Sequence, residues 1–320
     1  MSETLLSLGG APLTRFGLGT ALALLAVLLG AAFYARQTRM TYGAFVRLAV
    51  LSAPLSWLCA RILYVLANCT YYLTTLSNPA LALRFWDGGY SAAGAILGLW
   101  LAAFLAAKWT HLRPGQMLDA VSCGIPLGLM VERLFEGGTG MGLGRAISFD
   151  WLIFLGTDDG MGDLVHPVYR YEAVVAAVIF LVLALWLWRT RFRLPAGDVT
   201  LSLMTLLGTT QVVLESLRND GHMVVHFVRI QQVVYLLMAL ASLLIWAHRL
   251  RMKGGMKKSQ QLMLWLVALV CVGLGILMEF RVDRGSLKLL YYTVMVLCMA
   301  VIAGMTFRCR RQARQPGRHA

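Results

Sequence analysis

Long apolar stretches alternate with short polar connections along most of the chain. Nine stretches approach membrane-spanning length, at residues 17–35, 43–66, 88–108, 117–132, 171–188, 198–217, 227–247, 261–280 and 287–306. A transmembrane helix needs roughly 20 predominantly apolar residues. The pattern therefore predicts an all-α polytopic membrane protein with about nine transmembrane helices.

The first stretch is unlike a cleavable signal peptide. Arg15 is the only cation before it, and its exit, Phe33-Tyr34-Ala35-Arg36, is a poor small-residue cleavage site. We therefore expect this stretch to remain as the first transmembrane helix.

Composition supports a membrane location. Hydrophobic residues make up 59% of the chain and charged residues 14%, which is too apolar for a soluble domain that must cover itself with polar side chains. The formal net charge is +14, but the basic residues form short clusters between the apolar stretches rather than one basic face. The charge therefore indicates membrane topology, and we expect no nucleic-acid partner.

Basic residues mark alternate connections, those that follow the first, third, fifth, seventh and ninth stretches. These clusters lie at residues 36–39, 108–113, 189–193, 249–258 and 308–318. The acidic residues fall mainly at the opposite helix ends. Because cytoplasmic loops carry an excess of Lys and Arg, we expect the N-terminus outside and the C-terminus in the cytoplasm.

The cysteines are scattered singly, with no Cys-x-x-Cys pair: Cys59, Cys69, Cys123, Cys271, Cys298 and Cys309. We expect them to be small buried apolar residues rather than metal ligands or disulfide partners. No metal or cofactor is expected.

Two arginines lie within the second apolar stretch, where a cation costs about 2.5 to 3.5 kcal/mol. Arg47 is near the inner end and is expected to extend to the cytoplasmic surface. Arg61 would face either an aqueous cavity or a polar partner, and the sequence leaves both open. Pro54 lies between them and would loosen the helix.

The connection from about 133 to 170 is the long one. It holds a glycine-rich segment, 136–145, and then a short amphipathic segment, 148–155. The amphipathic segment would either lie in the headgroup layer with its aromatic residues or pack on the helices as an ordinary loop. The sequence does not distinguish the two.

Polar residues gather where the fifth stretch begins. In the segment 166–172, Pro167 suits a first helical turn and Glu172 suits a helix N-terminus. This explanation does not account for His166, Tyr169, Arg170 and Tyr171, which would lie at the depth of a phospholipid headgroup. Arginines on the same outer face are Arg133, Arg145, Arg170, Arg218 and Arg229. Guanidinium groups can bind phosphate through two parallel hydrogen bonds. For Glu132 and Arg133, which are adjacent at the end of a stretch, a hydrated helix end is an alternative explanation.

Several segments occur in an order shared with one known family. One is His166-Pro167-Val168-Tyr169-Arg170-Tyr171-Glu172-Ala173, which matches a His-Pro-x-x-x-Tyr-Glu-Ala motif at the start of a span. The others are Tyr42-Gly43, Ala60-Arg61-Ile62-Leu63-Tyr64-Val65-Leu66, Phe85-Trp86-Asp87-Gly88-Gly89-Tyr90-Ser91, Glu215-Ser216-Leu217-Arg218-Asn219-Asp220 and Arg229-Ile230-Gln231-Gln232. Together these segments resemble the prolipoprotein diacylglyceryl transferases.

The resemblance implies an enzyme of the bacterial plasma membrane. Members of the family move the diacylglyceryl group of phosphatidylglycerol onto the lipobox cysteine of a preprolipoprotein and release glycerol 1-phosphate. Such a substitution needs a base near the thiol and cations around the phosphate. The resemblance also implies a seven-helix core over residues 1–252, followed by a basic linker (253–260), an additional transmembrane hairpin (261–307) and a basic tail (308–320).

On this resemblance the expected catalytic residues are His166, Glu136 and Tyr171. His166 or Tyr171 would lie near the acceptor, and Glu136 would be a replacement base. The expected substrate-binding residues are Arg133, Arg218, Arg61, Tyr42, Tyr64, Glu172, Gln211 and Gln232. Of these, the two arginines Arg133 and Arg218 would clamp the phosphate.

Some departures from the family pattern bear on the reaction. Ala93 stands where the family has a histidine or tyrosine, Glu136 stands at a family asparagine, and Gln211 replaces an arginine. The main alternative is therefore a catalytically inactive homologue that binds lipid or a membrane partner. A transporter or channel is a further alternative because of Arg47 and Arg61, although no inverted repeat is visible.

Overall fold

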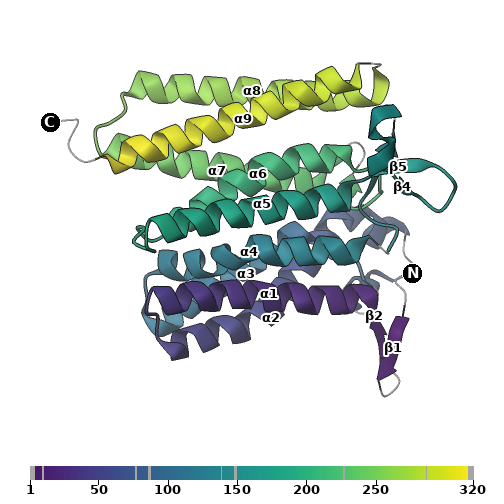
Figure 1. The fold of residues 1–320 in the computed structure, drawn as a ribbon, viewed down its shortest axis with the longest axis horizontal. Coiled ribbons are helices and arrows are strands. Elements are labelled where there is room, and N and C mark those ends of the chain that lie inside the picture. Colours follow the sequence, from purple (N-terminus) through teal and green to yellow (C-terminus); the bar gives the residue numbers. More distant parts are fainter. Residues whose placement is uncertain are drawn as a thin grey trace. The chain divides into compact units, whose positions relative to one another are not determined.

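The computed structural model of the 320-residue chain describes residues 4–8, 11–75, 78–85, 88–137, 139–147, 150–225, 228–285 and 287–315. Within these ranges the chain consists mainly of long α-helices (Figure 1). Trp86, Asp87, Ser148 and Phe149 belong to segments singled out in the sequence, and they lie outside the described residues.

The long helices are α1 (Arg15–Gln37), α2 (Tyr42–Ala67), α3 (Ala92–Thr110), α4 (Pro114–Glu136), α5 (Val168–Arg189), α6 (Asp198–Leu217), α7 (Ile230–Met252), α8 (Lys258–Arg284) and α9 (Lys288–Arg314). Each predicted apolar stretch overlaps one of them. In the described part of the chain, eight helices are long and apolar enough to cross a membrane. The helix α4 is not among the eight. The predicted all-α polytopic membrane fold is confirmed, and a ninth crossing stays a prediction.

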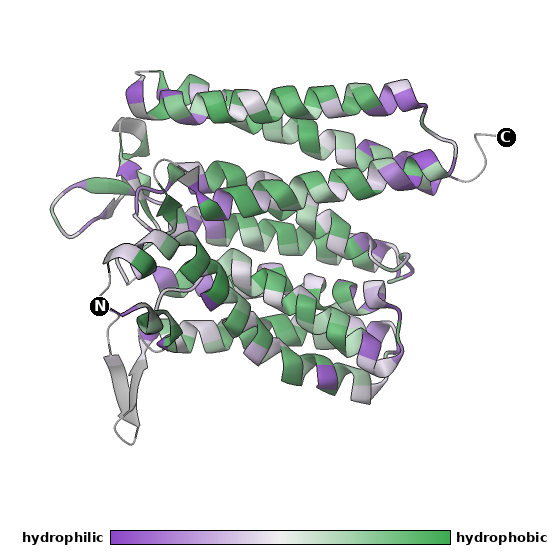
Figure 2. Ribbon diagram, turned by 180° about the vertical axis from the view of Figure 1, so that it is seen from behind, coloured by the Kyte–Doolittle hydropathy of each residue, from purple (hydrophilic) through white to green (hydrophobic). Residues whose placement is uncertain are grey.

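Hydrophobic residues occupy most of each helix, and hydrophilic residues gather toward the helix ends and connections (Figure 2). Large apolar side chains remain exposed along the helices, for example Leu29, Val174 and Leu269. A helix can lie in lipid because it satisfies its own backbone hydrogen bonds. The exposed apolar side chains are those that would face the hydrocarbon.

The long connection between α4 and α5 contains a small antiparallel sheet. Its strands are β3 (Leu143–Ala146), β5 (Leu164–Pro167) and β4 (Thr157–Asp158), in that spatial order. The glycine-rich sequence predicts only a loop here, because such short strands carry no clear two-residue apolar period. This sheet places the start of α5 beside the end of the glycine-rich segment.

Short hairpins and single helical turns occupy other connections, namely β1 (Thr4–Leu8) with β2 (Ala11–Thr14), β6 (Val224–Val225) with β7 (Val228–Arg229), η1 (Tyr71–Thr75), η2 (Pro79–Leu83) and η4 (Asp150–Leu155). The turn η4 falls in the predicted amphipathic segment. Its Phe154 is 79% exposed. An exposed aromatic side chain favours the headgroup layer, which stays a prediction for this segment.

The chain forms two compact units. The first comprises Met1–Thr200 and Leu217–Gln231, and the second comprises Leu201–Ser216 and Gln232–Ala320. The first unit therefore contains α1 to α5 and the connection between α6 and α7. The second contains most of α6 and α7 together with α8 and α9.

Small residues let the helices of the first unit approach closely. The helices α1 and α4 pack together, and a Cβ atom on Gly124 would overlap the backbone carbonyl of Val27. The pair α2 and α3 has the same feature, because a Cβ atom on Gly98 would overlap the carbonyl of Leu55. Close backbone approach at small residues is a common way to hold transmembrane helices together. It positions α2 and α4, which carry the polar side chains described below.

In the second unit, α9 is joined to α6 and α7. The hydroxyl of Tyr292 donates to the carbonyl oxygen of Ser216 at 3.3 Å, and Lys253 Nζ donates to that of Ala313 at 2.7 Å. A buried apolar cluster contains Leu201, Trp246, Leu250, Cys309 and Ala313. Within this unit the C-terminal helix therefore shares a core with α6 and α7.

Arg47 has partners at the surface. Its side chain is exposed, its Nη1 donates to the carbonyl oxygen of Trp109 at 3.4 Å, and its guanidinium lies 5.4 Å from the centre of the Trp109 ring. This agrees with an arginine that extends to the membrane surface.

The expected burial of the cysteines is confirmed for Cys123, Cys271, Cys298 and Cys309, and Cys59 is half-buried. The expectation is wrong for Cys69, which is exposed. The reason is that Cys69 lies beyond Asn68, the C-cap of α2, in the connection to α3.

Candidate functional site

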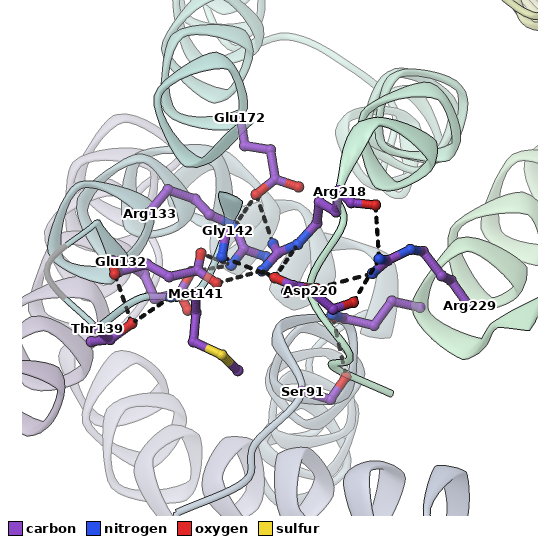
Figure 3. Close-up of polar contacts among 12 residues, drawn as sticks. Ser91, Glu132, Arg133, Thr139, Met141, Gly142, Glu172, Arg218, Asp220 and Arg229 are labelled. Atoms are coloured by element: carbon purple, nitrogen blue, oxygen red, sulfur yellow. Dashed lines mark hydrogen bonds and ion pairs between the residues drawn. The ribbon is translucent and has the colours of Figure 1, made fainter. Parts of the chain in front are cut away.

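A buried group of charged side chains lies where several elements of the first unit meet (Figure 3). The residues come from the end of α4, the start of α5 and the connection after α6. We call them the ionic cluster: Glu132, Arg133, Glu136, Glu172, Arg218, Asp220 and Arg229.

Arg133 joins carboxylates of α4 and α5. Its Nε lies 2.7 Å from Glu172 Oε2, its Nη1 pairs with Glu136 Oε2, and Glu132 Oε2 lies 3.4 Å from the same Nη1. Arg133 and Glu136 can pair because residues three apart share one side of a helix. Arg133 Nη2 is buried and has no hydrogen-bond partner among the described residues. One donor therefore remains for a ligand.

Arg218 binds two of the same carboxylates. Its Nη2 lies 2.6 Å from Glu136 Oε1 and 2.8 Å from Asp220 Oδ2, and its Nη1 lies 3.1 Å from Glu172 Oε2. Glu136 and Glu172 therefore each bridge Arg133 and Arg218. The two arginines expected to clamp a phosphate are thus brought together.

Asp220 links the ionic cluster to neighbouring loops. It accepts a hydrogen bond from the backbone N–H of Gly142 at 2.9 Å, and its Oδ1 lies 3.1 Å from Arg229 Nη1. Arg229 Nη2 also donates to the carbonyl oxygens of Arg218 and Asp220, at 2.8 and 2.7 Å. These bonds hold the glycine-rich connection and the segment 218–229 against each other.

The charges of the ionic cluster nearly balance, because four carboxylates meet three guanidinium groups. Buried ions cost several kcal/mol each unless they are paired. Burial alone would raise the pKa of Asp220, but Arg218, the Gly142 N–H and Arg229 hold it well below its usual range. Asp220 is therefore ionised at neutral pH, and the arginines are held in place with their charge compensated.

The glycines of the α4–α5 connection make room for Tyr169. A Cβ atom on Gly137 would overlap the Tyr169 ring, and one on Gly142 would lie 2.8 Å from Tyr169 Cβ. Gly142 also has φ of 71°, a conformation that favours glycine. The glycine-rich sequence is explained by this packing beside the ionic cluster.

Arg61 lies against a loop and not in the ionic cluster. Its buried guanidinium donates to carbonyl oxygens of the α2–α3 connection, those of Ala82 (3.2 Å), Arg84 (2.9 Å), Gly89 (3.2 Å) and Gly88. Of the two alternatives left by the sequence, the structure shows the polar partner. With partners for both Arg47 and Arg61, these arginines no longer indicate a transporter or channel.

Tyr64, one helical turn after Arg61, packs against two connections. Its ring centre is 5.4 Å from that of His222, with the ring planes inclined by 33°. The Arg61 guanidinium lies 5.9 Å from the Tyr64 ring centre. A Cβ atom on Gly89 would overlap the Tyr64 ring, so the ring is closely held. Tyr64 thereby joins α2 to the connection between α6 and α7.

His166 and Tyr171 contact each other. His166 Nδ1 lies 3.2 Å from the Tyr171 hydroxyl, and both side chains are half-buried. The imidazole can donate or accept in this contact, depending on its tautomer. The tautomer of His166 and the orientation of the Tyr171 hydroxyl are therefore coupled, and their role near an acceptor stays a prediction.

Tyr42, like Arg61 and Tyr64, is not part of the ionic cluster. Tyr42 begins α2 and is 82% exposed, while Tyr64 lies about 22 residues, or roughly 33 Å, along the same helix. Gln211 and Gln232 belong to the second unit. There Gln232 Nε2 donates to the carbonyl of Val212 at 3.0 Å and to Glu279 Oε2 at 3.3 Å.

The position of the missing family histidine is closed. Ala93 is fully buried at the start of α3. Its backbone N–H lies 3.4 Å from Gln231 Oε1, which also accepts from the Ser91 hydroxyl at 3.4 Å. A methyl group and a satisfied backbone amide cannot accept a proton, so any base must come from elsewhere.

Asp220, Arg229 and His222 were not among the site residues expected from the sequence. Asp220 and Arg229 complete the ionic cluster, and both lie in segments that resemble family motifs. The sequence signal for both is their place in those motifs. His222 lies just past such a segment, and only the folded chain brings it to Tyr64.

Comparison with known proteins extends over most of the chain. A model of the prolipoprotein diacylglyceryl transferase family matches residues 3–248. A phosphatidylglycerol–prolipoprotein diacylglyceryl transferase of Clostridioides difficile (strain 630) is 30% identical over 178 residues, which is 56% of this chain and 67% of the relative. One of a Wolbachia from Brugia malayi is 27% identical over 190 residues, 58% of this chain and 72% of the relative. One of Brucella anthropi is 33% identical over 161 residues, 50% of this chain and 56% of the relative.

The matched residues contain the whole ionic cluster and end before α8 begins. The family likeness therefore covers α1 to α6 and nearly all of α7, the same part of the chain from which the motifs were read. This multi-pass membrane protein belongs to the prolipoprotein diacylglyceryl transferase family.

Proposed function

We propose that this protein transfers the diacylglyceryl group of phosphatidylglycerol to the thiol of a lipobox cysteine in a preprolipoprotein. Family membership and the names of the relatives support this reaction. The observation that carries the proposal is the convergence of Arg133 and Arg218, from separate segments, on shared carboxylates in a buried site.

The reaction places new negative charge on a phosphate. The sulfur of the acceptor forms a bond with the glycerol carbon, the carbon–oxygen bond breaks, and glycerol 1-phosphate leaves with the bonding electrons. Cations that are already positioned stabilise this charge without further reorganisation. Arg133 offers its unpartnered Nη2, and the carboxylate of Glu136 occupies a place between Arg133 and Arg218 that a phosphate can take by exchange.

The orientation of the chain supports a reaction at the outer face. With the basic connections in the cytoplasm, the N-terminus lies outside, the C-terminus lies inside, and the ionic cluster lies at the outer end of α4. A bacterial plasma membrane presents phosphatidylglycerol and an exported preprolipoprotein at this face.

A direct assay tests the reaction. Purified protein in mixed micelles with phosphatidylglycerol and a lipobox peptide is expected to add the diacylglyceryl mass to the peptide and release glycerol phosphate. A peptide with serine in place of the cysteine is the matched control, because its hydroxyl does not form an anion at neutral pH. Failure of the unmodified protein to lipidate the cysteine peptide would contradict the proposal.

One observation favours a second function, binding of lipid or a membrane partner without catalysis. The charges of Arg133 and Arg218 are compensated within the ionic cluster, and Ala93 supplies no base. Complementation separates the two functions. Growth of a strain depleted of its own transferase, restored by this protein, excludes the inactive homologue, whereas a correctly inserted protein that restores no growth supports it.

A further inference from the structure

The proposed reaction requires a base that removes the proton from the acceptor thiol. Ala93 has no such group, and Glu136 uses both carboxylate oxygens in ion pairs with Arg133 and Arg218. Neither oxygen of this carboxylate is therefore free to accept a proton. A side chain other than Ala93 and Glu136 must therefore do this work.

His222 has the position that this role requires. It lies two residues after Asp220, in the connection between α6 and α7 that also contains Arg218. Its ring is half-buried and packs on Tyr64 of α2. No hydrogen bond to either ring nitrogen is present within the described ranges, so a nitrogen lone pair is available to a ligand that reaches the ring from solvent or lipid.

The surroundings keep this imidazole uncharged. The charged and titratable groups that act on it come from α2, α4 and its own connection, and they are Tyr64, Arg133, Glu136, Arg218 and Asp220. Burial first, and then Arg218, lower the pKa of His222 to about 4 despite the opposite effect of Asp220. A neutral imidazole is the form that accepts a proton. The same shift makes it a weaker base than a free histidine, so the assignment depends on the position of the ring and its open nitrogen.

We propose that His222 is the general base that accepts the proton of the acceptor thiol, at a site built from α2 and the α6–α7 connection. This assignment rests on the proposed function. The thiol proton moves to an imidazole nitrogen, the sulfur bonds to the glycerol carbon, and glycerol 1-phosphate leaves with the electrons of the broken carbon–oxygen bond. The imidazolium then returns its proton to the departing phosphate, whose dianion is held by Arg218 and Arg133.

Two substitutions separate this role from ring packing on Tyr64. His222→Phe keeps an aromatic ring of similar size but has no lone pair to accept a proton. His222→Ala opens a space that added imidazole can enter. His248→Gln is the matched control, because His248 is exposed on α7 in the second unit.

The experiment measures kcat and KM for lipidation of a lipobox peptide in mixed micelles. We expect His222→Phe to lower kcat by about 100-fold or more, the size of a general-base contribution, with little change in KM for phosphatidylglycerol. Added imidazole is expected to restore turnover to His222→Ala in proportion to its concentration, and His248→Gln is expected to match the unmodified protein.

Other outcomes overturn the assignment. If His222→Phe works within about fivefold of the unmodified protein, a difference far below that expected for a lost base, ring packing is sufficient. If imidazole does not restore His222→Ala, the side chain is not the base. If the unmodified protein itself forms no product, the proposed function fails, which is distinct from an active protein that does not depend on His222.

Discussion

Glu136 bridges Arg133 and Arg218, two arginines from different segments of the chain. Its Oε1 lies 2.6 Å from Arg218 Nη2, and its Oε2 pairs with Arg133 Nη1. The resemblance to the family suggested a replacement base at this position. In the structure this carboxylate holds two guanidinium groups together, so it would compete with any anion that approaches them, and its role as a base stays a prediction.

Glu136→Gln is expected to lower stability and to strengthen binding of phosphatidylglycerol. Loss of one partner of a buried ion pair lowers the free energy of unfolding by about 3 to 5 kcal/mol, while a neutral amide no longer competes with the phosphate. Thermal unfolding in detergent and binding of phosphatidylglycerol measure the two effects. Glu132→Gln is the control, since the Glu132 side chain is 19% exposed and makes a longer contact. Equal effects from both substitutions would argue against a bridging carboxylate.

Arg218→Lys is expected to reduce turnover by about 10- to 100-fold. An ammonium group keeps the charge but cannot reproduce the planar fork that reaches Glu136, Glu172 and Asp220, and each charge-assisted hydrogen bond contributes about 1.5 to 3 kcal/mol. The peptide lipidation assay measures the loss. Arg113→Lys, at an exposed position before α4, should behave like the unmodified protein. Full turnover in Arg218→Lys would show that the reaction does not need the planar guanidinium group of Arg218.

Gly124→Ala is expected to destabilise the first unit. The added Cβ atom would overlap the backbone of Val27, and forcing atoms into a well-packed site costs roughly 1 to 3 kcal/mol. Gly273→Ala on α8 is the matched control, because nothing lies within 4 Å of its added Cβ atom and alanine favours the helix by about 0.5 to 1 kcal/mol. Opposite shifts of the melting temperature are expected. A neutral result for Gly124→Ala would mean that α1 and α4 can move apart freely.

The pH dependence of the reaction follows from the lowered pKa of His222, which is about 4. The base must be uncharged, so activity is present above this pKa and is lost as the pH falls through it. The rate constant kcat/KM is therefore expected to stay level from pH 7 to about 5 and to decline near pH 4, whereas an unshifted histidine would decline near 6.5. A pH–rate profile of the unmodified protein decides between them. A decline that begins near 6.5 would show that His222 is not the base.

The helices were predictable because each apolar stretch has membrane-spanning length and is bounded by charged residues. The pattern located all of α1 to α9 with small errors at the ends. For example, the fourth stretch was expected at 117–132, whereas α4 runs from Pro114 to Glu136. Apolar periodicity does not detect the last polar turn, and in α4 that turn carries Arg133 and Glu136. The sequence therefore indicated where the site lies but not how its charges pair.

The partners of individual charges could not be predicted, because they depend on loops. Arg61 sits inside an apolar stretch and is satisfied by carbonyl groups of a connection more than 20 residues further along the chain. The sheet of β3, β4 and β5 is also held by pairing between distant short segments. Tyr42 failed to join Tyr64 for a simpler reason, since the two occupy opposite ends of one helix. Motif order alone does not separate the two faces, whereas the basic residues at 36–39 place the start of α2 at the predicted cytoplasmic end.

The four backbone oxygens that Arg61 binds affect how mutational scans of this protein should be interpreted. Loss of this guanidinium would leave those oxygens without donors. The α2–α3 connection, which packs against Tyr64, would then loosen, and activity would be lost although Arg61 does not contact the reacting groups. A screen that records activity alone would then count Arg61 among the reacting groups. Measuring whether such a variant still folds would instead identify Arg61 as a structural residue that holds the α2–α3 connection in place.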